Sequence, residues 1–443
     1  MILVLMPPPP GVSRTLLHAA ALTVFAVGLW ATAAIPEEVT AIAFFLLAML
    51  LAVAPPSVVF SGFAAQAVWL VFAGVVIGTA VKHTGLGERL ARALVLRIGR
   101  SYLAVITGLV VVAMVLAFLM PSSMGRVVLL IPVVNALAAQ LGFAEGSRGR
   151  IGMVMATGLA CFMPAAAVLP AAVPNLVLAG AAETQYGLAF AYMEFLRLHF
   201  PIIGIGDSVL IVLLTTLIFA ERPRPYAGVA RAGPITPAEK RLSVVLVAAL
   251  GLWATDTLHG VGPGWIGLAA ATACLLPALR LLPPKVFSGQ ANLAPVIYVA
   301  GILGMAAVVA DSGLAGWLGA ALFAVVPLEA GAEARNFASL VGIASATGFV
   351  ATMAGVPAVL APLADTLADA TGLPLYAVLM TQVIGYTALF IPYQSPPLVV
   401  AMQLGGVRLR DALRITLLLA ALELALLTPI NFLWWRWLGV FSQ

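Results

Sequence analysis

Charged residues are scarce in this chain. Asp, Glu, Lys and Arg make up 9% of its 443 residues and hydrophobic residues make up 63%, whereas soluble domains carry roughly 25% charged residues. The composition therefore predicts a polytopic membrane protein. The net charge of +5 comes from arginines in the loops, and no basic stretch interleaved with aromatic residues occurs. We therefore expect no nucleic-acid partner.

The sequence also lacks the residue patterns of many enzymes. It has 4 His and 2 Cys, and it contains no Gly-x-Ser-x-Gly, His-Glu-x-x-His or phosphate-binding loop. Cys161 and Cys274 lie in separate apolar segments, where we expect them to be small core side chains. Hydrolase and metal chemistry find no support, and we expect no enzyme. Residues 1–14 lack the charged start and the cleavage site of a signal peptide, so we expect none.

Apolar segments long enough to cross a bilayer occur throughout the chain, since a spanning helix needs about 20 residues. We expect an all-α fold with about ten spans, near residues 15–35, 39–54, 64–83, 150–180, 198–220, 242–258, 263–282, 291–310, 376–403 and 411–435. Segments 150–180 and 376–403 are too long for simple spans and contain prolines, which break helices because they lack a backbone N–H. We predict a broken helix in each.

Two further segments have the pattern of a re-entrant helical hairpin. In 101–141, an apolar run ending at Met120 meets the sequence PSSMGR (121–126), and the second apolar run is only about 13 residues long. In 337–371, we expect the tip near 352–357. Irregular backbone at membrane depth persists only where it is buried in protein or lines a cavity. Both tips are therefore candidate binding sites.

The chain repeats itself. PPSVVFSG (55–62) recurs as PPKVFSG (283–289), and WAT (30–32) recurs at 253–255. We therefore divide it into an N-terminal segment (1–14), a first repeat (15–221), a cytoplasmic linker (222–241) and a second repeat (242–443). Five spans per half is an odd number, so the halves should have opposite orientations, which is the inverted-repeat plan of secondary transporters.

Basic residues predict the orientation, because cytoplasmic loops carry an excess of Lys and Arg. With the N-terminus outside, the outer loops carry only Arg14, Arg197, Arg335 and Arg436. The inner loops then carry Lys82, Arg89, Arg92, Arg97, Arg100, Arg148, Arg150, Arg222, Arg224, Arg231, Lys240, Arg241, Arg280, Lys285, Arg408, Arg410 and Arg414. We expect a protein of the cytoplasmic membrane with both termini outside.

The sequence resembles the divalent anion:sodium symporter (DASS) family of the ion transporter superfamily. The resemblance covers nearly the whole chain and is strongest over residues 58–94, which include FSG (60–62) and KHTGLGER (82–89). It implies two inverted halves with opposed hairpins and broken helices, a homodimer, and an elevator mechanism in which a transport domain slides past a scaffold domain. It also implies a secondary transporter of a small anion, dicarboxylate- or sulfate-like.

The hairpin tips and helix breaks depart from the family pattern. The family places Ser-Asn-Thr at each tip, where those groups hold sodium and the substrate carboxylate, whereas this chain has SSM (122–124) and TMA (352–354). At the breaks, where the family has a threonine followed by Pro-Pro, it has AVPN (172–175) and SPPL (395–398). Hydroxyl ligands for sodium remain at Ser122, Ser123, Thr352 and Ser395, and backbone carbonyls at the breaks are further candidates. The coupling ion stays open between sodium and a proton, and we expect no other cofactor.

Arg126 lies close to the tip serines, inside the membrane according to the hairpin prediction. A charge there costs at least about 2.5–3.5 kcal/mol, and such residues usually line a site. Our hypothesis is that its guanidinium replaces a sodium ion, offsetting the charge of the substrate or binding its carboxylate. The alternative is an arginine whose side chain extends to the cytoplasmic face.

Polar residues at the tips and breaks complete the predicted site. The candidate substrate-binding residues are Ser122, Ser123, Arg126, Asn175, Thr352, Gln394 and Ser395. The alternatives are a helix cap for Asn175 and hydroxyls bonded to their own helix for the serines. Tyr386, Thr387 and Tyr393 are nearby polar groups.

Two further ionisable residues lie near apolar segments. Asp207 is a candidate for a coupling proton, although a role in pairing or helix packing is the preferred interpretation. His83 follows Lys82 at the cytoplasmic end of a span, where we expect a solvated side chain.

Three other functions remain compatible with this pattern. They are the membrane subunit of a binding-protein-dependent transporter of the same superfamily, a family member that carries a different small solute, and a channel. Duplicated hairpins and broken helices fit a closed site at the membrane midplane better than an open pore.

Overall fold

The computed structural model describes residues 13–32, 34–95, 101–223, 233–323, 326 and 328–442. Most of the N-terminal segment and part of the linker lie outside these ranges, as do Arg97, Arg100, Arg224 and Arg231. The described residues form helices and no strand, which confirms the all-α prediction.

The described helices of the first half extend from residue 14 to residue 219. They are α2 (Arg14–Thr32), α3 (Glu37–Leu50), α4 (Pro56–Val59), η1 (Ser61–Ala64), α5 (Gln66–Thr84), α6 (Leu86–Val95), α7 (Tyr102–Leu119), α8 (Ser123–Gln140), α9 (Arg148–Ala160), η2 (Pro164–Ala167), η3 (Leu169–Ala171), α10 (Val173–Tyr186), α11 (Tyr192–His199), η4 (Phe200–Asp207) and α12 (Ser208–Phe219).

The helices of the second half follow the linker. They are α13 (Pro237–Ala254), α14 (Asp256–His259), α15 (Pro263–Leu275), η5 (Pro277–Leu279), α16 (Pro284–Gln290), α17 (Ala294–Asp311), α18 (Leu314–Phe323), α19 (Glu333–Val350), α20 (Gly355–Leu360), η6 (Ala361–Leu363), α21 (Ala364–Thr371), α22 (Leu375–Thr387), η7 (Pro392–Gln394), α23 (Pro396–Gly405), α24 (Leu409–Leu422), η8 (Glu423–Leu427), α25 (Thr428–Trp437) and η9 (Val440–Ser442).

Within the described residues, 7 helices are long and apolar enough to cross a membrane, or up to 8 if a bent pair counts as one span. The seven include α7 and α8, the arms of the first predicted hairpin, and several of the ten predicted spans do not qualify because their helices are short or interrupted. Helices α15 and α22, for example, have 13 residues each and α23 has 10, which is well short of the roughly 20 that a crossing helix needs.

The two predicted hairpins differ in their helical arms: the second arm is one continuous helix in the first hairpin and an interrupted helix in the second. In the second, α19 and the α20–α21 helix meet at an angle of 116° around residues 351–354. In the first, α8 has 18 residues, longer than the apolar run that we counted, because it begins at Ser123 and continues through Pro132. The tip of the first hairpin is therefore Met120–Ser122, and Arg126 lies one turn inside α8.

The two predicted broken helices are interrupted at their prolines. Helix α9 ends at Ala160, and two short 3-10 turns containing Pro164 and Pro170 lead into α10, which has Pro174 in its first turn. In the second half, α22 ends at Thr387, and α23 begins with Pro396 and Pro397. Proline is tolerated in a first turn, where the missing N–H would have no helical partner.

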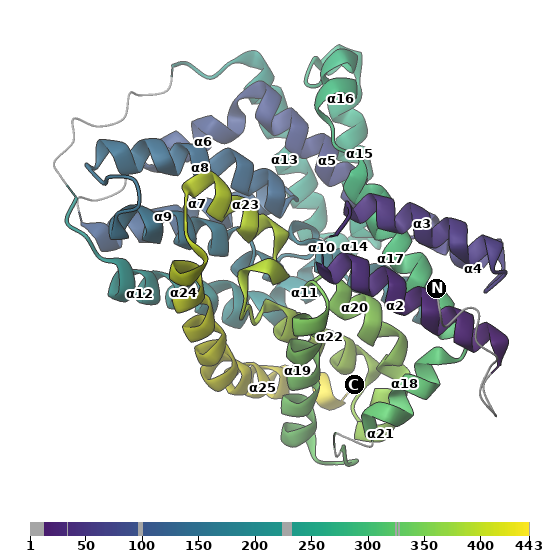
Figure 1. Cartoon of the computed structure of the whole chain (residues 1–443). Coiled ribbons are helices and arrows are strands. Elements are labelled where there is room, and N and C mark those ends of the chain that lie inside the picture. The colour runs from purple at the N-terminus through teal and green to yellow at the C-terminus, as the bar shows by residue number, and fades with distance from the viewer. Residues whose placement is uncertain are drawn as a thin grey trace.

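The helices of the two halves are packed together. In Figure 1, α7, α8, α9, α23 and α24 lie on one side and α2, α3, α17 and α18 on the other. Helix α23 of the second half packs against α8 and α9 of the first, and α17 packs against α3, α5 and α10. Gly304 permits a close approach of α17 to α4, since a Cβ there would clash with the Val59 carbonyl oxygen.

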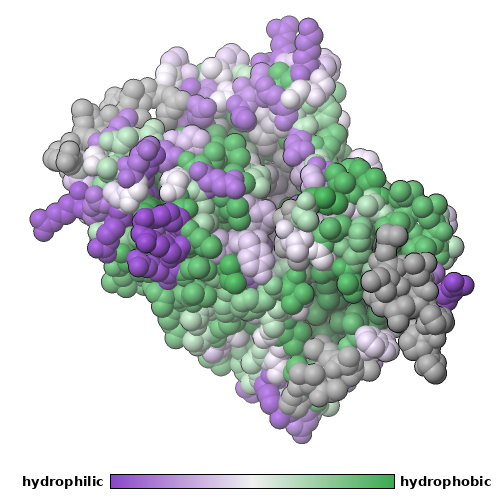
Figure 2. Space-filling model, in the orientation of Figure 1, coloured by the Kyte–Doolittle hydropathy of each residue, from purple (hydrophilic) through white to green (hydrophobic). Residues whose placement is uncertain are grey.

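The surface has the pattern of a membrane protein. Figure 2 shows a broad hydrophobic region across the visible face, with hydrophilic residues gathered at its upper, left and lower edges. Large apolar side chains such as Leu217, Val244 and Leu433 are more than half exposed, as expected for side chains that face lipid.

Candidate functional site

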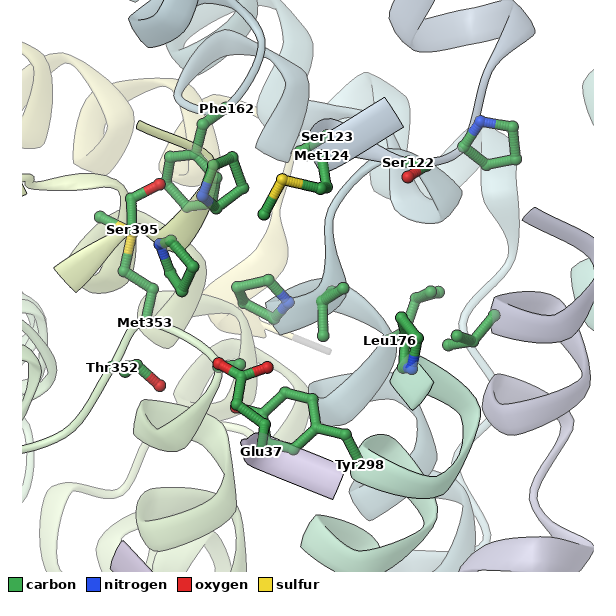
Figure 3. A pocket seen from close by; sticks show the side chains of 18 of the residues that line it. Glu37, Ser122, Ser123, Met124, Phe162, Leu176, Tyr298, Thr352, Met353 and Ser395 are labelled. Atoms are coloured by element: carbon green, nitrogen blue, oxygen red, sulfur yellow. The ribbon is translucent and has the colours of Figure 1, made fainter. Parts of the chain in front are cut away.

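A cavity of about 250 Å³ lies where the hairpin tips, the helix breaks and the α3, α5 and α17 helices meet. This volume is below the roughly 300–1,000 Å³ of pockets for drug-sized ligands, so the cavity suits a small solute. Figure 3 shows residues 122–124 of the first hairpin across the cavity from Glu37 and Tyr298, with Thr352, Met353 and Ser395 on a third side.

Five predicted site residues line this cavity, and two are buried behind its lining. The lining residues are Ser122, Ser123, Thr352, Gln394 and Ser395. Arg126 and Asn175 are fully buried and do not line it. The residues from both halves that the sequence singled out are therefore brought together, although not all of them face the same space.

Ser122 and Ser123 begin α8 at the edge of the cavity. The Ser122 side chain caps this helix by accepting a hydrogen bond of 3.1 Å from the Gly125 N–H. The Ser123 hydroxyl donates to the Ala171 carbonyl oxygen at 3.0 Å. The first hairpin is thereby fastened to the first helix break.

The Arg126 guanidinium is surrounded by backbone carbonyls. It donates to the carbonyl oxygens of Met120 (2.5 Å), Cys161 (2.8 Å) and Ala171 (3.0 Å), and to the Ser123 hydroxyl (3.1 Å). Met120 and Cys161 are the C-terminal caps of α7 and α9, where helix dipoles are negative. Arg126 therefore occupies a cradle of oxygens that is suited to a cation.

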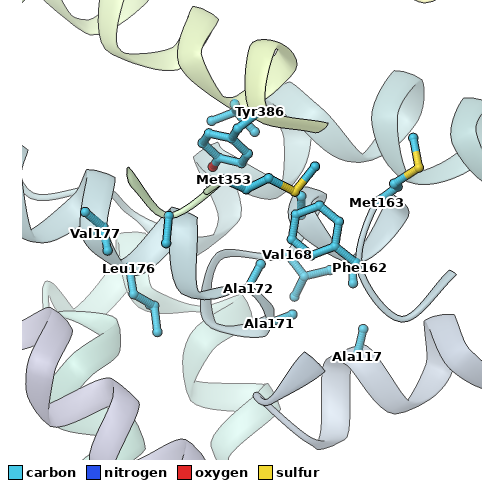
Figure 4. Close-up of a cluster of buried hydrophobic side chains, with 14 of the residues drawn as sticks. Ala117, Phe162, Met163, Val168, Ala171, Ala172, Leu176, Val177, Met353 and Tyr386 are labelled. Atoms are coloured by element: carbon cyan, nitrogen blue, oxygen red, sulfur yellow. The ribbon is translucent and has the colours of Figure 1, made fainter. Parts of the chain in front are cut away.

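Asn175 fastens the first helix break to the second half. Its amide donates to the carbonyl oxygens of Ala166, Val168 and Leu169, and its Oδ1 accepts from the Tyr386 hydroxyl at 2.5 Å. In Figure 4, Tyr386 and Met353 lie over this break. Asn175 thus satisfies carbonyls that the break leaves without helical partners.

Gln394 has the corresponding role at the second break. Its Oε1 accepts from the backbone N–H groups of Phe390 and Ile391, and its Nε2 donates to the Gly348 carbonyl oxygen at 2.7 Å. Its own carbonyl accepts from the Met353 N–H of the second hairpin. Because both its Oε1 and its Nε2 already bond to backbone groups, Gln394 holds the cavity wall in place.

Thr352 and Ser395 have hydroxyls free to bind a solute. Both residues are buried and line the cavity, and neither hydroxyl has a hydrogen-bond partner within the described part of the chain. The Tyr298 hydroxyl lies beside Thr352 but does not form a hydrogen bond of acceptable geometry with it. A buried polar atom without a partner is costly, so these two positions are the natural contacts for a polar ligand.

The first turns of five helices line the cavity. Residues of α8, α10 and α23 line it on the side of the hairpin and the breaks, and residues of α3 and α17 line the opposite side. Each helix N-terminus carries roughly half a positive charge. The charged residues among its described lining are Glu37 and Glu38, at the start of α3. The N-terminal ends of α8, α10 and α23 therefore lie on walls without a carboxylate among their described residues, whereas the two carboxylates lie at the N-terminal end of α3.

A family model described as the sodium:sulfate symporter transmembrane region matches residues 1–441. The chain belongs to the divalent anion:sodium symporter family. A relative in Cupriavidus necator, described as a membrane protein, is 25% identical over 99% of this chain and 91% of its own length. The L-tartrate/succinate antiporter of Escherichia coli is 24% identical over 84% of this chain and 79% of its own length.

Two solved structures share the fold of this DASS protein. The YdaH transporter of Alcanivorax borkumensis matches with a TM-score of 0.57 and 16% identity, over 87% of this chain and 88% of its own. MtrF of Neisseria gonorrhoeae, which represents a class of antimetabolite efflux pumps, matches with a TM-score of 0.53 and 15% identity, over 97% and 95%. The family is one of membrane transporters of anions, and at these identities the solved structures show the fold alone.

The remaining candidates lie outside the cavity lining of this DASS protein. The Tyr393 hydroxyl donates to the Phe349 carbonyl oxygen, Thr387 donates to Glu423, and His83 is exposed, as expected. Glu37 and Tyr298 could not be predicted from the sequence, because helices α3 and α17 carry no motif that marks them as cavity walls.

The contact between Asn175 and Tyr386 yields a first prediction. Because each substitution leaves a buried polar partner unsatisfied, we expect Asn175→Ala and Tyr386→Phe each to lower stability by about 1–3 kcal/mol. A double-mutant cycle should give a coupling energy of about 0.5–3 kcal/mol. Thermal unfolding of the purified variants measures both, and additive effects would contradict the link between the breaks.

Proposed function

We propose that this protein is a secondary active transporter of a small dianion, of the dicarboxylate or sulfate type, working by an elevator mechanism. The observation that carries the proposal is the cavity at which the N-termini of α8, α10 and α23 converge beside two unpaired hydroxyls. The name of the Escherichia coli relative favours a four-carbon dicarboxylate such as succinate or L-tartrate as the first substrate to test.

The charge of the site suits an anion that lies on the hairpin side. Three helix N-termini supply roughly +1.5 charges, and the Arg126 guanidinium lies directly behind Ser123. Glu37 and Glu38 on the opposite wall repel an anion from α3. A dianion placed against the breaks, accepting hydrogen bonds from Thr352 and Ser395, is therefore the best match to the field in the cavity.

We further propose that Arg126 acts as a built-in cation in the first half. A mobile sodium ion would need a shell of oxygens, and the carbonyls of Met120, Cys161 and Ala171 already bind this guanidinium. The cation then cannot leave, so the first half needs no sodium. The second hairpin has no corresponding arginine within its described residues.

Removing the free hydroxyls should weaken substrate binding. A hydrogen bond to a charged group contributes about 1.5–3 kcal/mol, so Thr352→Val and Ser395→Ala should each raise the KM for succinate or L-tartrate by roughly 10- to 100-fold. Uptake of either labelled dicarboxylate into vesicles containing the purified protein measures this. Thr347→Val is the matched control, since that hydroxyl bonds to Ile343 of its own helix outside the cavity. An unchanged KM in both variants would contradict the assignment.

Sodium should not be needed at the first hairpin if Arg126 is the resident cation. Replacing sodium by choline should therefore affect the stability of the wild type less than that of Arg126→Ala. Arg126→Ala should lose about 3–5 kcal/mol of stability, the usual cost of breaking a buried charged network, and sodium should partly restore its melting temperature by entering the vacated oxygens. Arg126→Lys keeps the charge and should be intermediate. A melting temperature of Arg126→Ala that does not respond to sodium would overturn this role.

The orientation can be tested by labelling from outside. We propose that the basic loops face the cytoplasm and both termini face outward, in line with the excess of inner Lys and Arg. Glu145→Cys, between α8 and α9, should be protected from an impermeant maleimide in intact cells, whereas Glu329→Cys, before α19, should react. Both native cysteines are buried, so the background should be low. The reverse pattern would invert the topology.

Reconstitution of the chain alone separates this proposal from a binding-protein-dependent transporter. Uptake without a soluble partner supports the secondary transporter, and uptake only with such a partner favours the other reading. Sulfate and a monocarboxylate in the same assay identify the substrate class.

A further inference from the structure

Two carboxylates lie deep between the last helices of the two halves. Asp207 is 0% exposed and Glu423 is 1% exposed. Asp207 ends the π-helical segment η4, and Glu423 begins the π-helical segment η8. Such segments are rare and frequently occur at functional sites.

The two π-helical segments pack against one another. Gly206, next to Asp207, lies so close to Leu427 that a Cβ there would be 3.0 Å from the leucine Cδ2 atom. At this contact, Asp207 and Glu423 lie close enough together for their negative charges to repel one another. Each half therefore contributes one carboxylate to the same buried place.

Neither carboxylate has a cation as partner in the part of the chain that the structure describes. Among the described residues, Asp207 accepts no hydrogen bond with either oxygen, and Glu423 uses only Oε1, which accepts from the Thr387 hydroxyl at 2.5 Å. An unpaired carboxylate in an apolar interior is costly, and two adjacent ones are more so. A proton removes this cost, because a protonated carboxyl group is neutral.

The surrounding elements supply no compensating charge near the pair. Segment η2 and helix α12 carry no titratable residue, and α22 contributes Tyr376 and Tyr386, of which Tyr386 is bonded to Asn175. On α11, His199 is buried against Met380, and Glu194 and Arg197 are exposed. The arginines of α24, its N-cap and α25 are all exposed: Arg408, Arg410, Arg414 and Arg436. The acidic residue of α24, Asp411, is paired with Arg408.

Both carboxylates are connected to the helix breaks. Thr387, the partner of Glu423, is the last residue of α22 before the second break. Segment η4, which ends at Asp207, packs against η2 in the first break, where Asn175 binds the Ala166 carbonyl. A change in the charge of the pair therefore acts on the elements that form the cavity.

We propose that Asp207 and Glu423 form one proton-binding site whose loading is coupled to anion movement. This inference rests on the proposed transport function. One proton from the aqueous phase binds a carboxylate oxygen, forming an O–H bond, and is released to water when the surrounding helices rearrange. No other reactant is needed, and the proton offsets part of the charge of the transported dianion.

A first experiment tests proton binding without transport. Infrared spectroscopy of the purified protein should show a protonated-carboxyl band at neutral pH that Asp207→Asn and Glu423→Gln together abolish. Asp207→Glu should retain the band, which separates loss of the proton from loss of folding. Asp411→Asn is the matched control, since that buried carboxylate on α24, the helix that leads into η8, is already paired with Arg408. A wild type without the band would overturn the proposal.

A second experiment tests coupling in vesicles that contain a trapped pH dye. A gradient of one pH unit should drive about tenfold accumulation of succinate or L-tartrate for each coupled proton, with dye acidification in step. Asp207→Asn and Glu423→Gln should abolish accumulation while exchange of labelled for unlabelled anion persists. Anion uptake by the wild type without proton movement would overturn the coupling. Failure to move either anion would count against the proposed function instead, leaving the infrared result to decide proton binding.

Discussion

The helix ends that terminate inside the protein impose the main constraint on this fold. A helix that stops within an apolar environment leaves backbone carbonyls and N–H groups without partners, and lipid cannot supply them. Arg126 satisfies carbonyls at the ends of α7 and α9, Asn175 satisfies those of the first break, and Gln394 satisfies groups of the second. These side chains therefore allow the helices to end around a cavity inside the membrane.

The two halves meet this constraint with different chemistry. In the first half a cation binds the carbonyls, and in the second a neutral amide bridges the break to the hairpin. Two helix breaks require that similar backbone groups be satisfied twice, but they do not require the same residue. The guanidinium also contributes a fixed positive charge beside the cavity, so the first half carries more of the electrostatic attraction for an anion.

Much of the fold could be predicted from sequence, but the direction of the side chains could not. Proline positions located both breaks, and the tip sequences located both groups of hydroxyls. The spacing from Ser123 to Arg126 placed the arginine at the tip, whereas α8 begins earlier and directs it back toward Met120. Glu423 was missed because a single acid within an apolar run does not reveal the π-helical segment that it begins. Glu37 was missed because its helix approaches the cavity only through tertiary packing.

The scarcity of polar groups in the cavity has a consequence for selectivity. With Gln394 and Ser123 engaged in holding the backbone, the free hydroxyls of Thr352 and Ser395 and the helix N-termini remain for recognition. Helix dipoles attract charge but distinguish poorly between anions of similar size, whereas unpaired hydroxyls discriminate through geometry. For the proposed dicarboxylate, specificity should therefore depend on the spacing of its two carboxylates, set by the distance between the second hairpin and the second break. A rigid link between these elements, through the Met353 N–H and the Gln394 carbonyl, fixes that spacing.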